Sequence, residues 1–287
     1  MSRIAYVNGL YVPHGSAAVH VEDRGYQFAD GVYEVVGVRN GRLIDEELHL
    51  DRLDRSLAEL AIARPMSRAA LKLVMREMLR RNRVRDGMLY VQMTRGVARR
   101  DHAIPERCTT SVVMTARRAK AVRLEDLREG VSVITIPDIR WERCDIKTIS
   151  LLANVLGKQK ACAAGVYEAW QVDAQGFVTE GTASNAWIVT KDGQLVTRHT
   201  DHAILSGVAR RSLLGLAKEE GLALVERPFT VEEARAAREA FITSTMSYIL
   251  PVVEIDGAVV GSGQPGPVTR RLQDRYMSYV DGPGARA

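Results

Sequence analysis

Residues 143–152 read Arg-Cys-Asp-Ile-Lys-Thr-Ile-Ser-Leu-Leu, and the lysine among them, Lys147, precedes a stretch with helical apolar spacing. The chain has only seven lysines, so few amines are available for chemistry that requires one. Partial burial beside Ile146 and Ile149 would lower the pKa of the amine and make it a better nucleophile. The alternative is a surface lysine whose stem packs on these isoleucines, and the segment taken alone favours that alternative.

Three further segments offer groups that could bind a cofactor. Residues 178–185 read Val-Thr-Glu-Gly-Thr-Ala-Ser-Asn, so that Glu180 lies beside hydroxyl residues and could hold a proton on a ring nitrogen. Residues 203–210 lead into a helix, whose first backbone N–H groups can bind a phosphate. The hydroxyl-rich residues 242–247 could bind the same phosphate. Taken alone, the Glu180 segment is better interpreted as an ordinary turn, and the other two segments are weak signals because helix starts and Ser/Thr-rich turns are common.

Composition restricts the class of protein. The chain has 287 residues, of which 46% are hydrophobic and 26% charged, as in a globular protein of one large or two ordinary domains. The net charge of +5 is spread along the chain and aromatic residues make up only 6%, which disfavours nucleic-acid binding and favours a small anionic ligand. No apolar stretch is long enough to span a membrane, and the first residues do not resemble a signal peptide.

The three cysteines indicate the redox state of the compartment, and the six histidines bear on whether the chain binds a metal. An odd number of widely spaced cysteines without a Cys-x-x-Cys pair favours a reducing compartment, which here means the cytoplasm. The histidines form no metal-binding pattern. No metal site is therefore expected.

Hydrophobic spacing and turn residues predict mixed helices and strands. The pairs Asn8-Gly9 and Asn40-Gly41 indicate two hairpin turns. Apolar spacings of three and four predict helices at 46–60 and, after the N-cap Ser67, at 67–81. Further helices are expected at 149–163, 208–220, 231–237 and 267–279. Strands are expected at 88–94, 111–115, 131–136, 168–172, 186–189, 194–196, 223–226, 240–243 and 252–255.

This order of elements predicts an α/β (α+β) fold of two domains. Residues 1–116 would form a small N-terminal α/β domain and residues 130–280 a larger C-terminal domain. Residues 117–129, which are highly charged and poor in strand-forming residues, would link them. The Gly/Pro-rich tail, 281–287, is expected to be disordered.

Together these segments resemble the fold-type-IV pyridoxal-phosphate enzymes, which include the D-amino acid and branched-chain aminotransferases. The resemblance runs from Tyr6 to about Gly257 and is closest to the D-amino acid aminotransferases. It rests on the Lys147 and Glu180 segments and on residues 30–35 (Asp-Gly-Val-Tyr-Glu-Val), 49–53 (His-Leu-Asp-Arg-Leu) and 205–207 (Leu-Ser-Gly). It implies a homodimer of two-domain subunits, with pyridoxal 5'-phosphate at the domain interface and the larger domain binding the cofactor.

The resemblance also implies the role of each cofactor-binding residue. Lys147 would hold the cofactor covalently and, once released by the substrate amine, would move the proton between the substrate Cα and the cofactor C4′. Glu180 would keep the pyridine nitrogen protonated. The phosphate would be bound by Arg52, Val208, Ala209 and Thr245, and the ring would pack against Leu205.

Residues 95–102, Arg-Gly-Val-Ala-Arg-Arg-Asp-His, resemble the loop that distinguishes the D-enzymes. In those enzymes an arginine and a histidine two positions later hold the substrate carboxylate, and here these residues are Arg100 and His102. Tyr33 matches the third partner, and the three side chains are suitable donors to a carboxylate. The loop is expected to reach the partner subunit's active site. Without the resemblance it would be interpreted as a flexible, solvated loop.

Three positions depart from the family pattern. Ala183, Ala209 and Met246 stand where many relatives have hydroxyl residues. Weaker cofactor binding is therefore expected, whereas the reaction type is unaffected because backbone amides remain.

The expected reaction moves the amino group of a D-amino acid, D-alanine above all, to a 2-oxo acid such as 2-oxoglutarate. It would follow a ping-pong course through pyridoxamine phosphate. Alternatives of the same fold are a branched-chain aminotransferase, an R-selective amine transaminase and an aminodeoxychorismate lyase, which Arg100 with His102 disfavours. A cofactor-binding protein without turnover is disfavoured by Lys147 with Glu180, and a basic binding module by the spread of charge.

Overall fold

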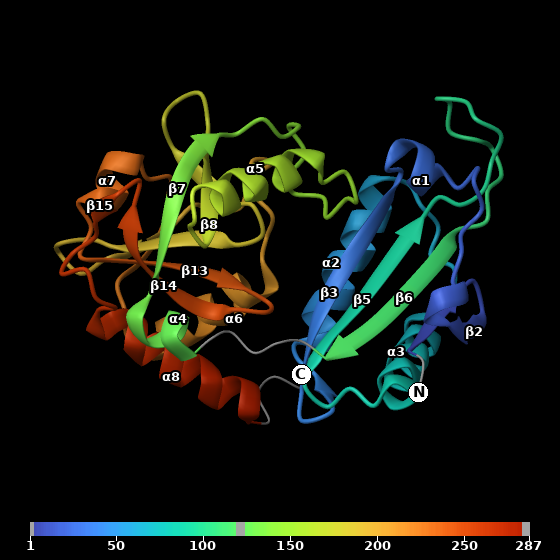
Figure 1. Ribbon diagram of the computed structural model, residues 1–287, viewed down its shortest axis with the longest axis horizontal. Helices are drawn as coiled ribbons and strands as arrows, with labels where there is room; N and C mark the ends of the chain where they lie inside the picture. The colour runs from blue at the N-terminus through green and yellow to red at the C-terminus, as the bar shows by residue number, and fades with distance from the viewer. Residues whose placement is uncertain (1–2, 119–123, 283–287) are drawn as a thin grey trace. The chain divides into compact units, whose positions relative to one another are not determined.

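The computed structural model describes residues 3–118 and 124–282 (Figure 1). These residues form two compact units. The first contains residues 3–118 together with Ile146–Ser150, and the second contains residues 124–145 and 151–282. The Lys147 segment, expected in the C-terminal domain, is thus grouped with the first unit.

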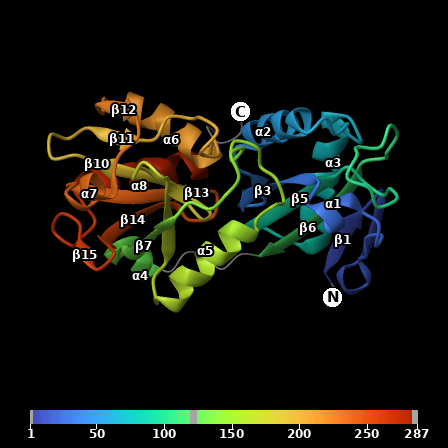
Figure 2. The same ribbon diagram turned by 90° about the horizontal axis from the view of Figure 1, so that it is seen from above.

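The first unit is an antiparallel sheet covered on one face by two helices. Its six strands run in the order β2-β1-β6-β5-β3-β4. Helices α2 (Glu46–Glu59) and α3 (Arg68–Asn82) lie on the same side of the sheet (Figure 2). The strands are β1 (Ile4–Val7), β2 (Leu10–Pro13), β3 (Gly31–Arg39), β4 (Arg42–Leu43), β5 (Gly87–Thr94) and β6 (Ser111–Arg118), and the short helices are η1 (His14–Ser16) and α1 (Arg24–Phe28).

Alternation of side chains along β3 explains how this sheet meets its helices. Val32, Glu34 and Val36 are buried, while Tyr33 and Val35 between them are only half-buried. Because successive strand residues point to opposite faces, the buried set faces α2 and α3 and the other set faces away from them.

The second unit is a mixed sheet of nine strands in the order β12-β11-β10-β13-β14-β7-β8-β9, with β15 beside β14. Strand β9 also lies next to β10, so the sheet curls around its own core, in which the rings of Trp170 and Phe229 meet. The strands are β7 (Val131–Pro137), β8 (Glu168–Val172), β9 (Val178–Gly181), β10 (Asn185–Val189), β11 (Leu195–Thr197), β12 (Leu224–Glu226), β13 (Glu239–Ser244), β14 (Tyr248–Ile255) and β15 (Ala258–Val259).

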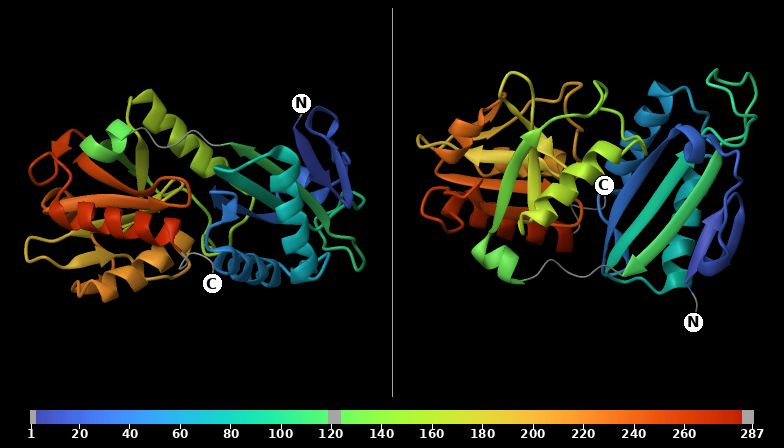
Figure 3. Two further views of the ribbon diagram at one scale, coloured as in Figure 1. Left: turned by 90° about the horizontal axis from the view of Figure 1, so that it is seen from below. Right: turned by 45° about the horizontal axis from the view of Figure 1, so that its top comes forward.

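Five helices surround this sheet. They are α4 (Leu124–Glu129), α5 (Leu152–Ala163), α6 (Val208–Glu219), α7 (Val231–Arg235) and α8 (Pro267–Asp281). Helices α6 and α8 pack against each other and on β13, while α5 packs on β7 and β8 (Figure 3). No helix within residues 3–118 and 124–282 is long and apolar enough to cross a membrane.

The expected helices and strands are present in the expected order, together with shorter elements that were not predicted. Ser67 caps α3 as predicted, its hydroxyl accepting a hydrogen bond from the Ala70 N–H at 3.2 Å. Helix α5 begins at Leu152 rather than at Ile149, because the residues before it are extended. The sequence reasoning missed η1, α1, α4, β9 and β15.

The two irregular segments expected from composition lie partly outside the described residues. Of the expected linker, residues 119–123 are not described, 117–118 complete β6 and 124–129 form α4. Of the expected tail, residues 283–287 are not described, and Asp281 is the last residue of α8.

Candidate active site

The Lys147 segment lies along a free edge of β3. Strand β4 pairs with β3 only at Val38 and Arg39, which leaves the backbone of the first residues of β3 without a partner strand on that side. The Lys147 segment fills this gap as a short antiparallel bridge: the Tyr33 N–H donates to the Lys147 carbonyl at 3.0 Å, and the Ile149 N–H donates to the Gly31 carbonyl at 3.1 Å. The segment is therefore extended, not helical.

Three further contacts anchor Lys147 in the first unit. Its backbone N–H donates to the hydroxyl of Ser56, a fully buried residue of α2, at 3.2 Å. The preceding Ile146 is buried in the first hydrophobic core. The Lys147 Nζ lies 4.3 Å from the centre of the Tyr33 ring. The structure thus brings together two of the expected site residues, Lys147 and Tyr33.

A second tyrosine backs this pair. The Tyr90 ring lies 5.7 Å from that of Tyr33, and its hydroxyl donates to Gln92 Oε1 at 2.7 Å. Burial, with a smaller effect of Tyr33, raises the pKa of Tyr90 to about 12. Tyr90 is therefore a neutral hydrogen-bond donor at physiological pH.

Arg52 is held by a buried carboxylate on the helix-covered face of β3. Its guanidinium donates in bidentate fashion to Glu34, with Nε–Oε1 and Nη2–Oε2 distances of 2.8 and 2.9 Å. His49, one turn earlier on α2, approaches the same carboxylate through Nδ1 at 2.7 Å. Since a carboxylate only accepts, Nδ1 of His49 carries the proton.

The charges of this cluster follow from its burial. Burial alone would raise the pKa of Glu34, but the neighbouring Arg52 and His49 lower it to about 2. Burial lowers the pKa of His49, opposed in part by Glu34, so the imidazole is neutral at pH 7. Glu34 is thus an anion that fixes the Arg52 guanidinium in one orientation.

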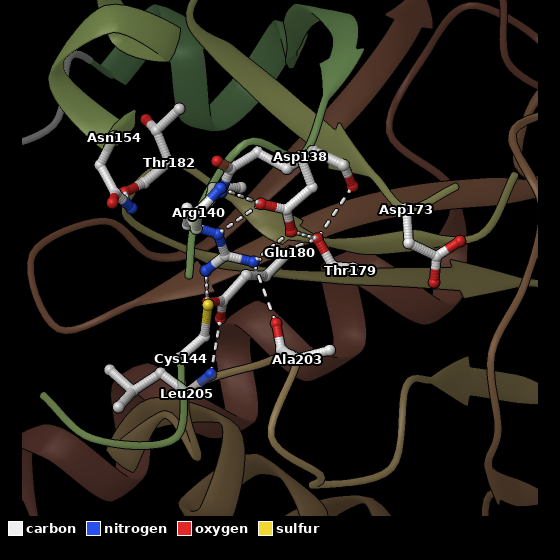
Figure 4. Close-up of polar contacts among 12 residues, drawn as sticks. Asp138, Arg140, Cys144, Asn154, Asp173, Thr179, Glu180, Thr182, Ala203 and Leu205 are labelled. Atoms are coloured by element: carbon white, nitrogen blue, oxygen red, sulfur yellow. Dashed lines mark hydrogen bonds and ion pairs between the residues drawn. The ribbon is translucent and has the colours of Figure 1, made fainter. Parts of the chain in front are cut away.

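In the second unit Glu180 is surrounded by hydrogen-bond donors (Figure 4). Arg140 Nη1 donates to Glu180 Oε1 at 2.5 Å, while Asn185 Nδ2 and the Leu205 backbone N–H donate to Oε2 at 3.0 and 3.1 Å. The Glu180 side chain is buried, with 9% of its area exposed. All three donors favour its ionised form.

Arg140 is itself held on its other side by a carboxylate (Figure 4). Its Nε and Nη2 donate to Asp138 at 2.9 and 2.7 Å, and Nη2 also donates to the Ala203 carbonyl at 3.0 Å. Burial alone would raise the pKa of Asp138, but hydrogen bonds from Arg140 and Thr179 lower it. Nearby, burial raises the pKa of Cys144 to about 12, so that thiol is neutral. The cluster of Asp138, Arg140 and Glu180 therefore carries one net negative charge.

The start of α6 is positioned by the same asparagine that contacts Glu180. Asn185 Nδ2 donates to the Leu205 carbonyl at 3.0 Å, and a Cβ on Gly207 would lie 2.0 Å from Asn185 Oδ1. A side chain at position 207 would therefore require the Asn185 amide to move. The helix has no side-chain cap, and its first residues, Val208 and Ala209, are buried. Its first backbone N–H groups have no partner within the helix, as a phosphate site requires.

Thr245 lies in the turn that follows β13. The start of that turn is connected to the start of β10, because Asn185 pairs with Thr243 across the two strands. The turn is closed by a hydrogen bond of 2.6 Å between the Ser244 and Ser247 hydroxyl groups. Met246 in this turn is half-buried, whereas Ala183 is exposed and Ala209 buried.

Arg100 and His102 contact Phe28, the last residue of α1, and not Tyr33. Arg100 lies over the Phe28 ring at 5.0 Å, and the His102 ring meets the same ring edge-on at 5.5 Å. Among the described residues, no hydrogen bond or ring contact joins either side chain to Tyr33. Both are exposed.

Several residues of these clusters were not predicted. Asp138 and Arg140 follow a strand that was expected, β7, and a charged pair at the end of a strand is a usable signal. Asn185 lay within the quoted Glu180 segment but was not singled out. Glu34 and His49 lay within quoted motifs without a role, because only the fold shows that both side chains point at Arg52.

Comparison with known proteins assigns the family. Residues 31–255 match the family model of the class IV aminotransferases. D-alanine aminotransferase of Bacillus licheniformis is 43% identical over 273 residues, covering 95% of each chain. That of Staphylococcus haemolyticus is 38% identical over 276 residues, covering 96% of this chain and 97% of the relative. The solved branched-chain aminotransferase of Thermoproteus uzoniensis with norvaline is 28% identical, with a TM-score of 0.84 over 98% of this chain and 95% of that one.

This chain belongs to the class IV aminotransferases, an enzyme family that depends on pyridoxal phosphate, and its fold is that of fold type IV. The resemblance drawn from the motifs is thereby confirmed.

The buried Glu34 generates a prediction about stability. Its folded-state pKa of about 2 lies below the ordinary 4.5, so its stabilising contribution is complete above pH 4.5 and is lost as the pH falls towards 2. Glu34→Gln would remove this contribution and leave Arg52 buried without its counter-charge, at a cost of about 3–5 kcal/mol at pH 7. Urea unfolding of both proteins at pH 7 and pH 3 would measure it.

Glu77→Gln is the matched control. Glu77 also has its pKa lowered to about 2 by two arginines, but it is only half-buried and its partners Arg80 and Arg81 are exposed, so its loss should change the stability little. A Glu34→Gln variant as stable as Glu77→Gln would contradict the assignment.

Proposed function

We propose that this aminotransferase moves the amino group of a D-amino acid, D-alanine above all, to a 2-oxo acid such as 2-oxoglutarate. The proposal is supported by two relatives named D-alanine aminotransferase, which this chain matches over nearly its whole length. It is carried by one observation, the clamped carboxylate of Glu180, which fits the cofactor of this family.

The charge of the Glu180 cluster suits a protonated ring nitrogen. Asp138 and Glu180 share one guanidinium, so the buried cluster has one negative charge in excess. A cationic pyridine nitrogen at Glu180 would balance that charge. Arg140, Asn185 and the Leu205 N–H would keep Glu180 ionised, so that the proton stays on the ring. When bound, pyridoxal phosphate supplies an electron-withdrawing ring that stabilises negative charge at the substrate Cα.

The phosphate of the cofactor would be bound at the start of α6. The backbone N–H groups of Val208 and Ala209 have the orientation and the dipole that an anion needs. Thr245 and Arg52 would complete the site, with Arg52 oriented by Glu34. Because Ala209 has no hydroxyl group, most donors here would be backbone amides. Leu205 would pack against the cofactor ring.

Lys147 would hold the cofactor and move the proton. Its backbone is fixed to β3 and Ser56, so that chiefly its side chain is free to move. Nζ would take the proton from the substrate Cα and deliver it to the carbon that receives the amino group. The Tyr33 ring, whose centre lies 4.3 Å from Nζ, would limit the positions that this side chain can take.

The substrate carboxylate would select the enantiomer. Lys147 acts from one face, so the side on which the carboxylate is held decides which enantiomer presents its Cα–H to Nζ. Tyr33 would hold it together with Arg100 and His102 supplied by the partner subunit. Their exposed position, apart from Tyr33 in the same chain, agrees with action on a second subunit.

Exposed features support a homodimer in the cytoplasm. Leu152, Val155 and Leu156 form one face of α5 and are 72%, 58% and 48% exposed, which suits an interface between subunits. Cys108, Cys144 and Cys162 are unbridged, as in a reducing compartment.

Replacing Lys147 by alanine should abolish turnover. Loss of a covalent catalyst typically lowers kcat by several orders of magnitude, on the order of 10⁴-fold or more. Borohydride should no longer fix the cofactor to the chain, as followed by mass spectrometry. Lys158→Ala is the control, since that lysine also lies over a tyrosine ring, at 4.9 Å from Tyr167. Cofactor still fixed to another lysine in the Lys147 variant would refute the assignment.

Replacing Arg100 by alanine should weaken the use of D-alanine far more than that of an amine without a carboxylate. A charge-assisted bidentate pair contributes about 1.5–3 kcal/mol, so kcat/KM for D-alanine should fall roughly ten- to a few-hundredfold. Steady-state assays with both substrates measure this, with Arg99→Ala as the neighbouring control. Equal losses for the two substrates would show that Arg100 does not bind the carboxylate.

A further inference from the structure

The loop that carries Arg100 and His102 is closed tightly at its base. Gly96 adopts a φ of +102°, and a Cβ there would lie 1.9 Å from the Thr109 carbonyl oxygen on the returning leg. The Thr110 hydroxyl donates to the Ala63 carbonyl at 2.7 Å. The base is therefore fixed, while the residues at the tip are exposed. Contacts at the base do not by themselves fix the residues around Arg100 and His102.

A buried arginine of α1 reaches this tip. Arg24 is 4% exposed, and its Nη1 donates to the carbonyls of Asp101 and Ala103 at 2.7 and 3.3 Å. These two carbonyls flank His102. A single guanidinium thus holds the backbone on both sides of that histidine.

Arg24 belongs to a rigid framework. Its Nε donates to Asp30 Oδ2 at 2.7 Å, and Asp30 also accepts two hydrogen bonds from Arg95 at 2.8 and 3.0 Å. The backbone N–H of Arg24 donates to the Gly96 carbonyl at 2.9 Å. The preceding Asp23 caps α1 by accepting from the Gly25 N–H. Because these contacts are buried, the guanidinium is held in one place.

Phe28, at the other end of α1, supports the side chains of the tip. The guanidinium carbons of Arg24 and Arg100 lie 4.9 and 5.0 Å from the centre of the Phe28 ring. The His102 ring meets the same ring edge-on. A ring face attracts cations, so it favours one orientation of the Arg100 guanidinium.

We propose that Arg24 and Phe28 are positioning residues that preform the carboxylate-binding loop, Arg24 through the backbone around His102 and Phe28 through the Arg100 guanidinium. The inference rests on the proposed function, in which Arg100 and His102 bind the substrate carboxylate. A loop ordered before the substrate arrives avoids the cost of ordering it on binding, so the effect falls on KM.

The first test replaces Arg24 by glutamine. Two charge-assisted hydrogen bonds to the loop are lost, so KM for D-alanine should rise about ten- to a hundredfold while kcat changes less than about threefold. KM for an amine without a carboxylate should stay within about twofold. Tryptic cleavage after Arg99, Arg100 or Arg107 should accelerate by about tenfold, because the loop loses its tether.

Arg198→Gln is the matched control. Arg198, like Arg24, is a largely buried arginine in an ion pair, here with Asp173 and Asp201, but it lies in the second unit and has no contact among those described with a residue of the loop. It should change neither KM nor loop cleavage. Arg24→Lys, which keeps the charge but loses the planar fork, should fall between the wild type and Arg24→Gln.

Phe28→Leu tests the proposal without removing a buried charge. It keeps an apolar side chain but no ring face, so KM for D-alanine should rise about two- to fivefold, and Phe28→Tyr should restore the wild-type value.

Equal rises in KM for D-alanine and the amine, or unchanged loop cleavage in Arg24→Gln, would overturn the proposal. A wild type that does not use D-alanine would instead refute the proposed function, and the cleavage rates would still decide whether Arg24 orders the loop.

Discussion

The free edge of β3 between Gly31 and Tyr33 is the constraint on which the candidate site depends. A strand edge left unpaired exposes backbone donors and acceptors, and here the Lys147 carbonyl and the Ile149 N–H, from a distant part of the chain, pair with Tyr33 and Gly31. Because the pairing is made by backbone, it fixes Lys147 independently of its side chain. The amine thereby comes to lie on the Tyr33 ring. The same strand carries Glu34 on its opposite face, so one element orients both Lys147 and Arg52.

Buried charges in both units are arranged in the same way. Glu34 accepts from Arg52 and His49, and Glu180 accepts from Arg140, Asn185 and the Leu205 N–H. A carboxylate with so many donors stays ionised despite its burial, since the donors offset the loss of hydration. The clusters differ in their net charge. The pairing of Arg52 with Glu34 is neutral, whereas Asp138, Arg140 and Glu180 leave one negative charge, which suits a cationic ligand.

Local patterns predicted most of the fold, and the failures have a common cause. Helices α2 and α3 were predicted from apolar spacing and from the Ser67 cap, both of which are local features. The start of α5 was placed three residues too early, because Ile149 fits helical spacing but pairs with β3, far away in the sequence. Lys147 and Tyr33 were each singled out for a separate role, and their contact was not predicted. Arg140 and Arg24 were missed, since their roles arise from neighbours 40 and 77 residues away along the chain. Spacing cannot reveal such contacts.

The central claim is that Lys147 and the carboxylate-binding residues together select a D-amino acid. The most direct measurement mixes the cofactor-loaded wild type with D-alanine or L-alanine and follows both the cofactor absorbance and the pyruvate formed in a single turnover. Conversion with D-alanine, at a rate at least about a hundredfold above that with L-alanine, is the predicted result. Conversion with L-alanine at an equal or higher rate would contradict the account.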